Sequence, residues 1–212
     1  DLILDKDGRV SGVKATMNGA EYTFNAKGGV VLATGGFGAN KEMVKKYNPK
    51  IDERFMTTDA PGTTGEALYI AEKAGAELVN MGYIQTYPIC DPISGVIELI
   101  ADSRFDGAIM LNQEGKRFVE ELDRRDVLSE AILNQTGGYC WVLWNDNIGK
   151  ISNTVGTHTT EYEAFTKQGI MKTCDDLKCI ADFTKIPFDQ LKKTVDRVTS
   201  MAGKGNDKDF NH

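Results

Sequence analysis

The chain has 212 residues and a formal net charge of −6, from 25 basic and 31 acidic residues. This length is enough for one large domain or two small ones. Because the Lys and Arg residues are scattered rather than clustered, the charge gives no support for binding to nucleic acid or to an anionic membrane. No apolar run approaches the ~20 residues that a membrane-spanning helix needs, so we expect no membrane insertion.

The first 34 residues predict β-structure. Asp7-Gly8 and Asn18-Gly19 are strong hairpin turns that separate alternating runs at residues 2–4, 10–17 and 21–24. Residues 30–33, Val-Val-Leu-Ala, form a short apolar run of the kind that is buried on both faces of a sheet. The sequence therefore predicts two hairpins followed by a buried strand.

A glycine turn with bare backbone at Gly35, Gly36 and Gly38 follows this predicted strand. Asn40 suits an N-cap for a helix near residues 41–47. A second helix is predicted at residues 64–74, with Gly75 as its stop. A strand, a glycine turn and a helix in this order are typical of the wall of a nucleotide site, although no Gly-x-Gly-x-x-Gly pattern occurs in the chain.

From residue 81 the pattern changes to a mixed α+β module. Trp141 and Trp144 are interpreted as core packing, and the predicted fold class is α+β or α/β with a boundary near residue 80. The expected elements are an extended segment at 83–88, strands at 108–111 and 139–144, a turn at 112–115, and helices at 125–134, 175–183 and 187–201.

The chain has four cysteines and two histidines. The cysteines are too few and too irregularly spaced for a disulfide scaffold, and Cys174 and Cys179 lack the Cys-x-x-Cys spacing of zinc or redox sites. We expect Cys90, Cys140, Cys174 and Cys179 to be free thiols, which favours a cytoplasmic location slightly and leaves a secreted or periplasmic one open. No Asp or Glu cluster has a loop-ligand spacing, so we expect no metal site.

Five passages carry a family resemblance in their order and spacing. They are Val30-Val-Leu-Ala-Thr-Gly-Gly-Phe, Pro61-Gly-Thr-Thr-Gly-Glu-Ala-Leu, Ile84-Gln-Thr-Tyr-Pro, the run from Gly107 to Glu121, and Arg124-Arg-Asp. Together they resemble the fumarate reductase and succinate dehydrogenase flavoprotein family, in particular its soluble FAD-dependent enoate reductases.

This resemblance implies that residues 1–80 form part of an FAD-binding domain that lacks the N-terminal glycine-turn half. Residues 81–212 would form the capping domain that closes over the substrate. The implied cofactor is FAD, and the implied partners are a small unsaturated carboxylate and an electron donor carrying haem, FMN or another carrier such as a nicotinamide. We expect the isolated chain to be inactive and to bind FAD poorly or not at all.

The reaction of such enzymes needs a hydride at one alkene carbon, a proton at the other, and cations that polarise the conjugated carboxylate. The resemblance assigns the proton donor to Arg125. An arginine can give up a proton only where neighbouring cations and a low dielectric destabilise its charge. Without the flanking passages, residues 124–126 would be interpreted as the solvated start of a helix.

The resemblance also places a proton relay just before Gly107. Arg104 matches the relay arginine, but Ala101 occupies the position of the relay glutamate, with Asp102 beside it. Ile100 occupies the position of a substrate-binding threonine. These differences argue against fumarate, because a dicarboxylate needs hydrogen-bond donors at both ends and Ile100 provides none.

Tyr87 stands where fumarate reductases place a carboxylate-binding histidine. Together with Asp102 it resembles the urocanate reductase subgroup, because a phenol can stack on or bond to a ring and a carboxylate can accept an imidazole N–H. An aryl-acrylate is equally compatible with Tyr87 and Ile100. Tyr87 as a packed core residue, and Asp102 as a relay carboxylate or a loop cap, stay open as alternatives.

The resemblance assigns flavin contacts to two loops; the alternative for the first loop is that Gly35 and Gly36 only allow a tight turn from strand to helix. Two other functions are kept as alternatives: a ketosteroid-dehydrogenase-like flavoprotein, which shares the sheet and uses tyrosines for enolate chemistry, and a non-catalytic binding fragment. The assigned flavin contacts are Thr34, Gly35, Gly36, Phe37, Thr64, Gly65 and Glu66.

Overall fold

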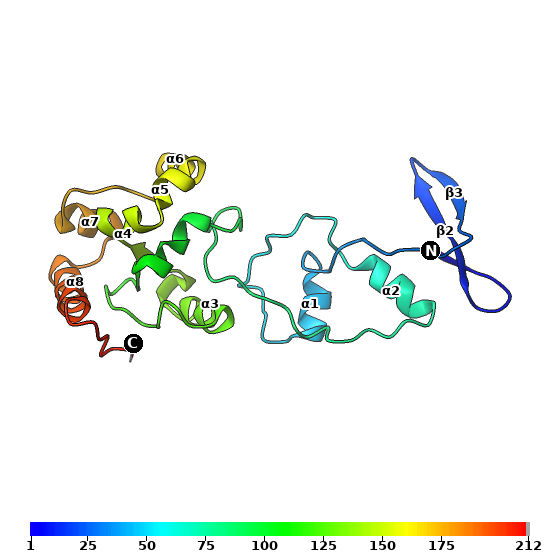
Figure 1. The fold of residues 1–212 in the computed structure, drawn as a ribbon, viewed down its shortest axis with the longest axis horizontal. Coiled ribbons are helices and arrows are strands. Elements are labelled where there is room, and N and C mark those ends of the chain that lie inside the picture. Colours follow the sequence, from blue (N-terminus) through cyan, green and yellow to red (C-terminus); the bar gives the residue numbers. More distant parts are fainter. Residues whose placement is uncertain (211–212) are drawn as a thin grey trace. The chain divides into compact units, whose positions relative to one another are not determined.

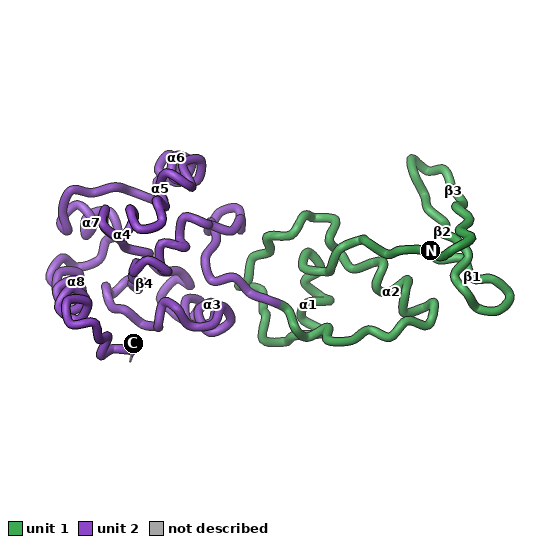
Figure 2. The backbone as a smooth tube through the Cα atoms, in the orientation of Figure 1, with its two compact units in different colours: residues 1–84 green, residues 85–212 purple. Residues whose placement is uncertain are grey.

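The computed structural model describes residues 1–210. The chain divides into two compact units, residues 1–84 and residues 85–212, which Figure 2 shows in different colours. The boundary expected near residue 80 lies close to the end of the first unit. The mixed α and β composition predicted from the sequence is confirmed.

The first unit begins with an antiparallel sheet in the order β1-β2-β3, whose strands are labelled in Figure 2. Gly8 and Gly19 both have φ near +80°, at 78° and 79°, which is the backbone conformation that tight hairpin turns require of a glycine. Both predicted hairpins are therefore confirmed. The strands are β1 (Leu2–Leu4), β2 (Val10–Met17) and β3 (Ala20–Asn25).

Both predicted helices of the first unit are also present, as α1 (Lys41–Tyr47) and α2 (Glu66–Lys73). Asn40 caps α1, because its Oδ1 accepts the Met43 N–H at 3.0 Å. Gly75, with φ of 96°, follows the end of α2 as expected.

The predicted buried strand at residues 30–33 is wrong. The segment has no strand structure, and Val31 is 89% exposed. An apolar run becomes a strand only where neighbouring backbone completes its hydrogen-bond ladder. The strands described in residues 1–84 pair only with one another, and none of them pairs with this segment.

The second unit contains a two-stranded antiparallel sheet, in which Met110 is opposite Val142. The helices and strands of this unit run from green to red in Figure 1. They are η1 (Leu99–Asp106), β4 (Ile109–Leu111), α3 (Arg125–Leu133), η2 (Thr136–Gly138), β5 (Trp141–Leu143), α4 (Asp146–Ile151), α5 (Thr154–Thr157), α6 (Thr159–Gln168), α7 (Leu177–Thr184) and α8 (Phe188–Ala202).

Strand β4 is buried on both faces because its side chains alternate between two core clusters. Met110 packs with Leu128 and Ile132 of α3 in the first cluster. Ile109 and Leu111 pack in the second, with residues of α7 and α8. Trp141 joins the second cluster, which confirms it as core packing, whereas Trp144 is half-buried and is not among the residues that pack on either cluster.

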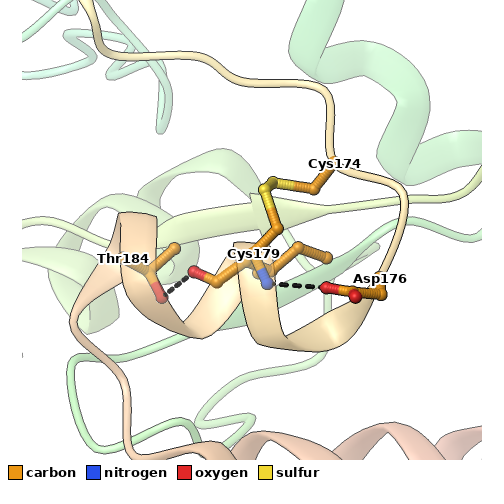
Figure 3. The surroundings of a disulfide bond; sticks show 5 residues. Cys174, Asp176, Cys179 and Thr184 are labelled. Carbon is orange, nitrogen blue, oxygen red and sulfur yellow. Dashed lines mark hydrogen bonds between the residues drawn. A yellow bond between two sulfur atoms is a disulfide. The ribbon is translucent and has the colours of Figure 1, made fainter.

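The prediction that all four cysteines are free is wrong. Cys174 and Cys179 form a disulfide between the segment before α7 and the first turn of that helix (Figure 3). Asp176 caps the helix by accepting the Cys179 N–H at 2.8 Å, so the chain turns back and the two Cα atoms come within 5.6 Å. The helix cap therefore brings together two cysteines whose spacing in the sequence did not predict a disulfide. Cys90 and Cys140 are free.

Candidate functional site

Three of the predicted site residues meet in the second unit, from three separate segments. The Tyr87 hydroxyl, on extended chain, donates a hydrogen bond of 2.9 Å to Asp102 Oδ1 in η1. The guanidinium carbon of Arg125, the first residue of α3, lies 5.2 Å from the centre of the Tyr87 ring. The structure thus joins a phenol, a carboxylate and a cation in one group.

Helix η1 fixes Asp102 by burying its neighbours. Ile100 and Ala101 are 1% and 3% exposed, and Ala101 lies in the core cluster on which Tyr87 also packs. Gly107, with φ of 112°, ends the helix. Ile100 and Ala101 therefore act as anchors of the group in this structure, while Asp102 stays half-buried beside Tyr87.

The environment of Tyr87 keeps its phenol protonated. Burial, followed by the hydrogen bond and the charge of Asp102, raises the pKa of Tyr87 to about 12. The charges of Arg104 and Arg125 act in the opposite direction. Tyr87 is therefore a hydrogen-bond donor at neutral pH, and both arginines act on it electrostatically.

Arg104 is a buried cation beside this group, with 3% of its surface exposed. Its Nη1 donates a hydrogen bond of 2.9 Å to the Glu121 carbonyl oxygen, and its guanidinium carbon lies 4.2 Å from the centre of the Phe105 ring. Its Nε has no hydrogen-bond partner among residues 1–210. A buried donor without a hydrogen bond costs free energy, so binding of a further acceptor at Arg104 Nε would be favourable.

The structure distinguishes the two adjacent arginines. Arg124 forms an ion pair with Asp126 at 2.7 Å, and this exposed pair raises the pKa of Arg124 and lowers that of Asp126. Arg125 instead faces the Tyr87 ring, with its side chain exposed. Of the two arginines, Arg125 is therefore the one that lies against Tyr87.

Sequence reasoning missed a buried ion pair next to the site. Arg117 Nη2 lies 2.6 Å from Glu121 Oε2, and both side chains are almost fully buried. The signal was present as an Arg and a Glu four residues apart within an apolar passage. The carbonyl oxygen of Glu121 also accepts a hydrogen bond from Arg104. Arg117 is therefore connected to Arg104 through Glu121.

The predicted flavin contacts lie in the first unit, where two loops are adjacent. The Ala39 N–H donates to the Thr63 carbonyl oxygen at 3.0 Å, and Asn40 Nδ2 donates to the Thr64 carbonyl oxygen at 2.9 Å. Asn40 therefore both caps α1 and fixes the loop before α2. These bonds place residues 39–40 beside residues 63–64, and Phe37 lies close to Gly65.

Glycine is required at Gly65 by close packing. Its φ is 76°, and a Cβ there would lie 2.6 Å from both Phe37 Cβ and Met43 Sδ. Gly35 and Gly36 differ, because both are exposed and only Thr63 Cγ2, 3.9 Å from a Cβ at Gly35, comes near. Their bare backbone is open to a ligand.

Within residues 1–210, no helix has the length and apolar character needed to cross a membrane. The same residues contain no group of three His, Cys, Asp or Glu side chains arranged to hold a metal ion.

Comparison with known proteins matches residues 1–212 to the family described as FAD binding domain. The chain is 39% identical to urocanate reductase of Eggerthella lenta, covering all of the chain and 35% of that protein. It is 38% identical to NADH:acrylate oxidoreductase of Vibrio harveyi, covering 99% of the chain and 21% of that protein.

Among solved structures, the open conformation of a flavocytochrome c3 fumarate reductase matches with a TM-score of 0.75 and 29% identity. The match covers all of the chain and 36% of that protein. The chain therefore spans only a minor part of the length of the proteins that it matches.

Proposed function

The chain belongs to the FAD binding domain family, and we propose that it is a portion of an FAD-dependent oxidoreductase that reduces the C=C bond of an α,β-unsaturated carboxylate. The resemblance to the fumarate reductase flavoproteins is confirmed by the relatives. The observation that carries the proposal is the meeting of Tyr87, Asp102 and Arg125 beside the buried cation Arg104.

The residues of the first unit fit a flavin. The exposed Gly35 and Gly36 place no Cβ in the way of a ligand, and the N-cap Gly65 leaves the first turn of α2 without a side-chain cap. The proposed contacts are those expected from the sequence, with Thr34 and Phe37 in one loop and Thr64 and Glu66 in the other. When bound, FAD supplies the hydride for one alkene carbon.

Arg125 is proposed to give a proton to the other alkene carbon. Its side chain is exposed in the second unit, so the substrate and the rest of the full-length protein must cover it before its charge is destabilised. Arg104 and Asp102 are proposed to return a proton to Arg125 after each turnover. Asp102 accepts a hydrogen bond from Tyr87, and the charge of Arg104 acts on Tyr87, which supports a relay through these residues.

The residues around Tyr87 favour an enoate with an imidazole or aryl end over fumarate. Asp102 Oδ1 accepts the Tyr87 hydroxyl, which leaves Asp102 Oδ2 to accept an imidazole N–H. The Ile100 N–H is donated to Glu161 Oε2 at 2.8 Å, so Ile100 offers no donor to a second carboxylate. We propose that Ile100 and Ala101 form the apolar floor beneath the substrate.

The test uses the full-length protein with its flavin reduced, and follows flavin reoxidation by urocanate, cinnamate-type acids and fumarate. Urocanate or an aryl-acrylate is expected to reoxidise the flavin faster than fumarate. Fastest reoxidation by fumarate would show that the substrate assignment is wrong. Failure of every enoate would remove the proposed function.

The isolated chain is proposed to be inactive and to bind FAD weakly or not at all. Titration of the chain with FAD, followed by flavin fluorescence, measures this directly. Micromolar binding would contradict it and would show that the loops at residues 34–37 and 64–66 suffice for flavin binding.

A further inference from the structure

Glu121 is buried, with 5% of its surface exposed, and it is held at three oxygens. Its Oε1 accepts the Met110 N–H and Arg117 Nε, both at 2.9 Å, and its Oε2 accepts Arg117 Nη2 at 2.6 Å. Its carbonyl oxygen accepts Arg104 Nη1 at 2.9 Å. One residue therefore connects strand β4, Arg117 and Arg104.

Arg117 is itself held by a second carboxylate. Its Nη2 lies 2.8 Å from Asp207 Oδ2, and its guanidinium carbon lies 4.8 Å from the centre of the Phe210 ring. Burial lowers the pKa of Arg117, but the hydrogen bonds and charges of Glu121 and Asp207 outweigh burial and raise it overall. Arg117 thus stays charged and ties the segment after α8 to Glu121.

Arg104 depends on this arrangement for its orientation. The Glu121 carbonyl accepts its Nη1, and its Nε has no partner among residues 1–210. A guanidinium is a rigid, planar fork, so a shift of that one acceptor turns the whole group. Misplacement of a reacting group by about 1 Å can lower a rate by about a hundredfold.

We propose that Glu121 is a positioning residue that holds Arg104 in its working orientation, and that Arg117 and Asp207 hold Glu121. The inference rests on the proposed function, because it concerns the arginine assigned to proton relay. Stability alone is a weak explanation for this ion pair, since a buried pair can often be replaced by apolar residues without loss of stability. A positioning role predicts loss of activity in a protein that remains folded.

The first arm of the test is NMR of the arginine side-chain N–H groups in the chain itself. The Arg104 signal is identified by its absence in Arg104→Lys. It is expected to exchange slowly in wild type and to be lost or averaged in Glu121→Gln. Glu130→Gln, which makes the same charge change at an exposed position of α3, is the matched control and should leave the signal unchanged.

The second arm measures flavin reoxidation by the best enoate in the full-length protein. Glu121→Gln is expected to lower kcat by about ten- to a hundredfold, with KM changed less than about threefold and normal flavin content. Glu130→Gln should match wild type. Should Glu121→Gln fail to fold, the double variant Arg117→Met/Glu121→Gln removes both charges while keeping an acceptor for the Met110 N–H, and the same results are expected of it.

A slowly exchanging Arg104 signal in folded Glu121→Gln, or in the folded double variant Arg117→Met/Glu121→Gln, overturns the proposal. So does an unchanged kcat in a variant that has lost the signal. If no enoate reoxidises the wild-type flavin, the proposed function falls, and the NMR arm still decides whether Glu121 holds Arg104.

Discussion

The hydroxyl of Tyr87 donates a hydrogen bond of 2.9 Å to Asp102, and the ring of the same residue lies against the guanidinium of Arg125. Tyr87 therefore links η1 to the first turn of α3. Because burial and Asp102 keep the phenol protonated, the link persists across the physiological pH range.

A double-mutant cycle measures the Tyr87–Asp102 bond. Tyr87→Phe and Asp102→Ala are each expected to destabilise the second unit, and the pair should show a coupling of about 1 kcal/mol because both variants remove the same hydrogen bond. Urea unfolding of the four proteins gives the free energies. Strictly additive effects would show that the bond contributes nothing to stability.

Gly65→Ala is expected to destabilise the first unit more than Gly75→Ala does. Both glycines have positive φ, so each substitution strains the backbone by about 1 kcal/mol. Only at Gly65 would the new Cβ also lie 2.6 Å from Phe37 and Met43, while at Gly75 nothing lies within 4 Å. Thermal unfolding of the two variants compares them directly, and equal losses would contradict the packing at Gly65.

Titration of Glu98 is expected to lower the free energy of unfolding of the second unit as pH rises. Burial, then the charges of Asp91 and Glu161, raise the pKa of Glu98 to about 7. The folded state thus binds a proton that the unfolded chain has released, so this stabilisation is complete below the unfolded value of 4.5 and is lost as pH rises through 7. Glu98 also acts electrostatically on Cys90, and His158 Nδ1 lies 4.0 Å from Glu161 Oε1.

Glu98→Gln is therefore expected to show a flatter stability profile than wild type between these two pH values. Urea unfolding at several pH values measures the slope. Glu130→Gln, at an exposed position, should keep the wild-type slope. A wild-type slope in Glu98→Gln would contradict the burial of a protonated Glu98.

Removing the disulfide should destabilise the second unit moderately. Cys174 and Cys179 close a short loop, with a sequence separation of 5, for which chain entropy predicts roughly 2 kcal/mol. Unfolding with and without reductant is expected to differ for wild type and to coincide for Cys174→Ser/Cys179→Ser. A wild-type protein that does not respond to reductant would contradict the disulfide.

Local signals in the sequence predicted much of the fold. Asn40 correctly predicted the start of α1, because an N-cap side chain bonds to the backbone only a few residues away. The prediction of a strand at residues 30–33 was wrong for the opposite reason, because the hydrogen bonds of a strand are made with other segments. The helices between residues 146 and 168 were missed because Thr, Asn and Gly give them low intrinsic propensity.

The candidate site shows the same division. The family resemblance pointed to Tyr87, Asp102, Arg104 and Arg125, which the fold brings together. It did not reveal Glu121 as the acceptor for Arg104, because a backbone carbonyl leaves no trace in residue type. Nor could spacing show that Arg124 is paired with Asp126 while its neighbour faces Tyr87.

The most direct test of the account compares two adjacent arginines in the full-length protein. Reoxidation of the reduced flavin by the preferred enoate is measured in Arg125→Lys and in Arg124→Lys. Arg125→Lys is expected to lower the rate by about 10²–10⁴, because general acid catalysis contributes that much. Arg124→Lys should stay within about twofold of wild type, since its ion pair with Asp126 is exposed. Equal rates in the two variants would contradict Arg125 as the proton donor.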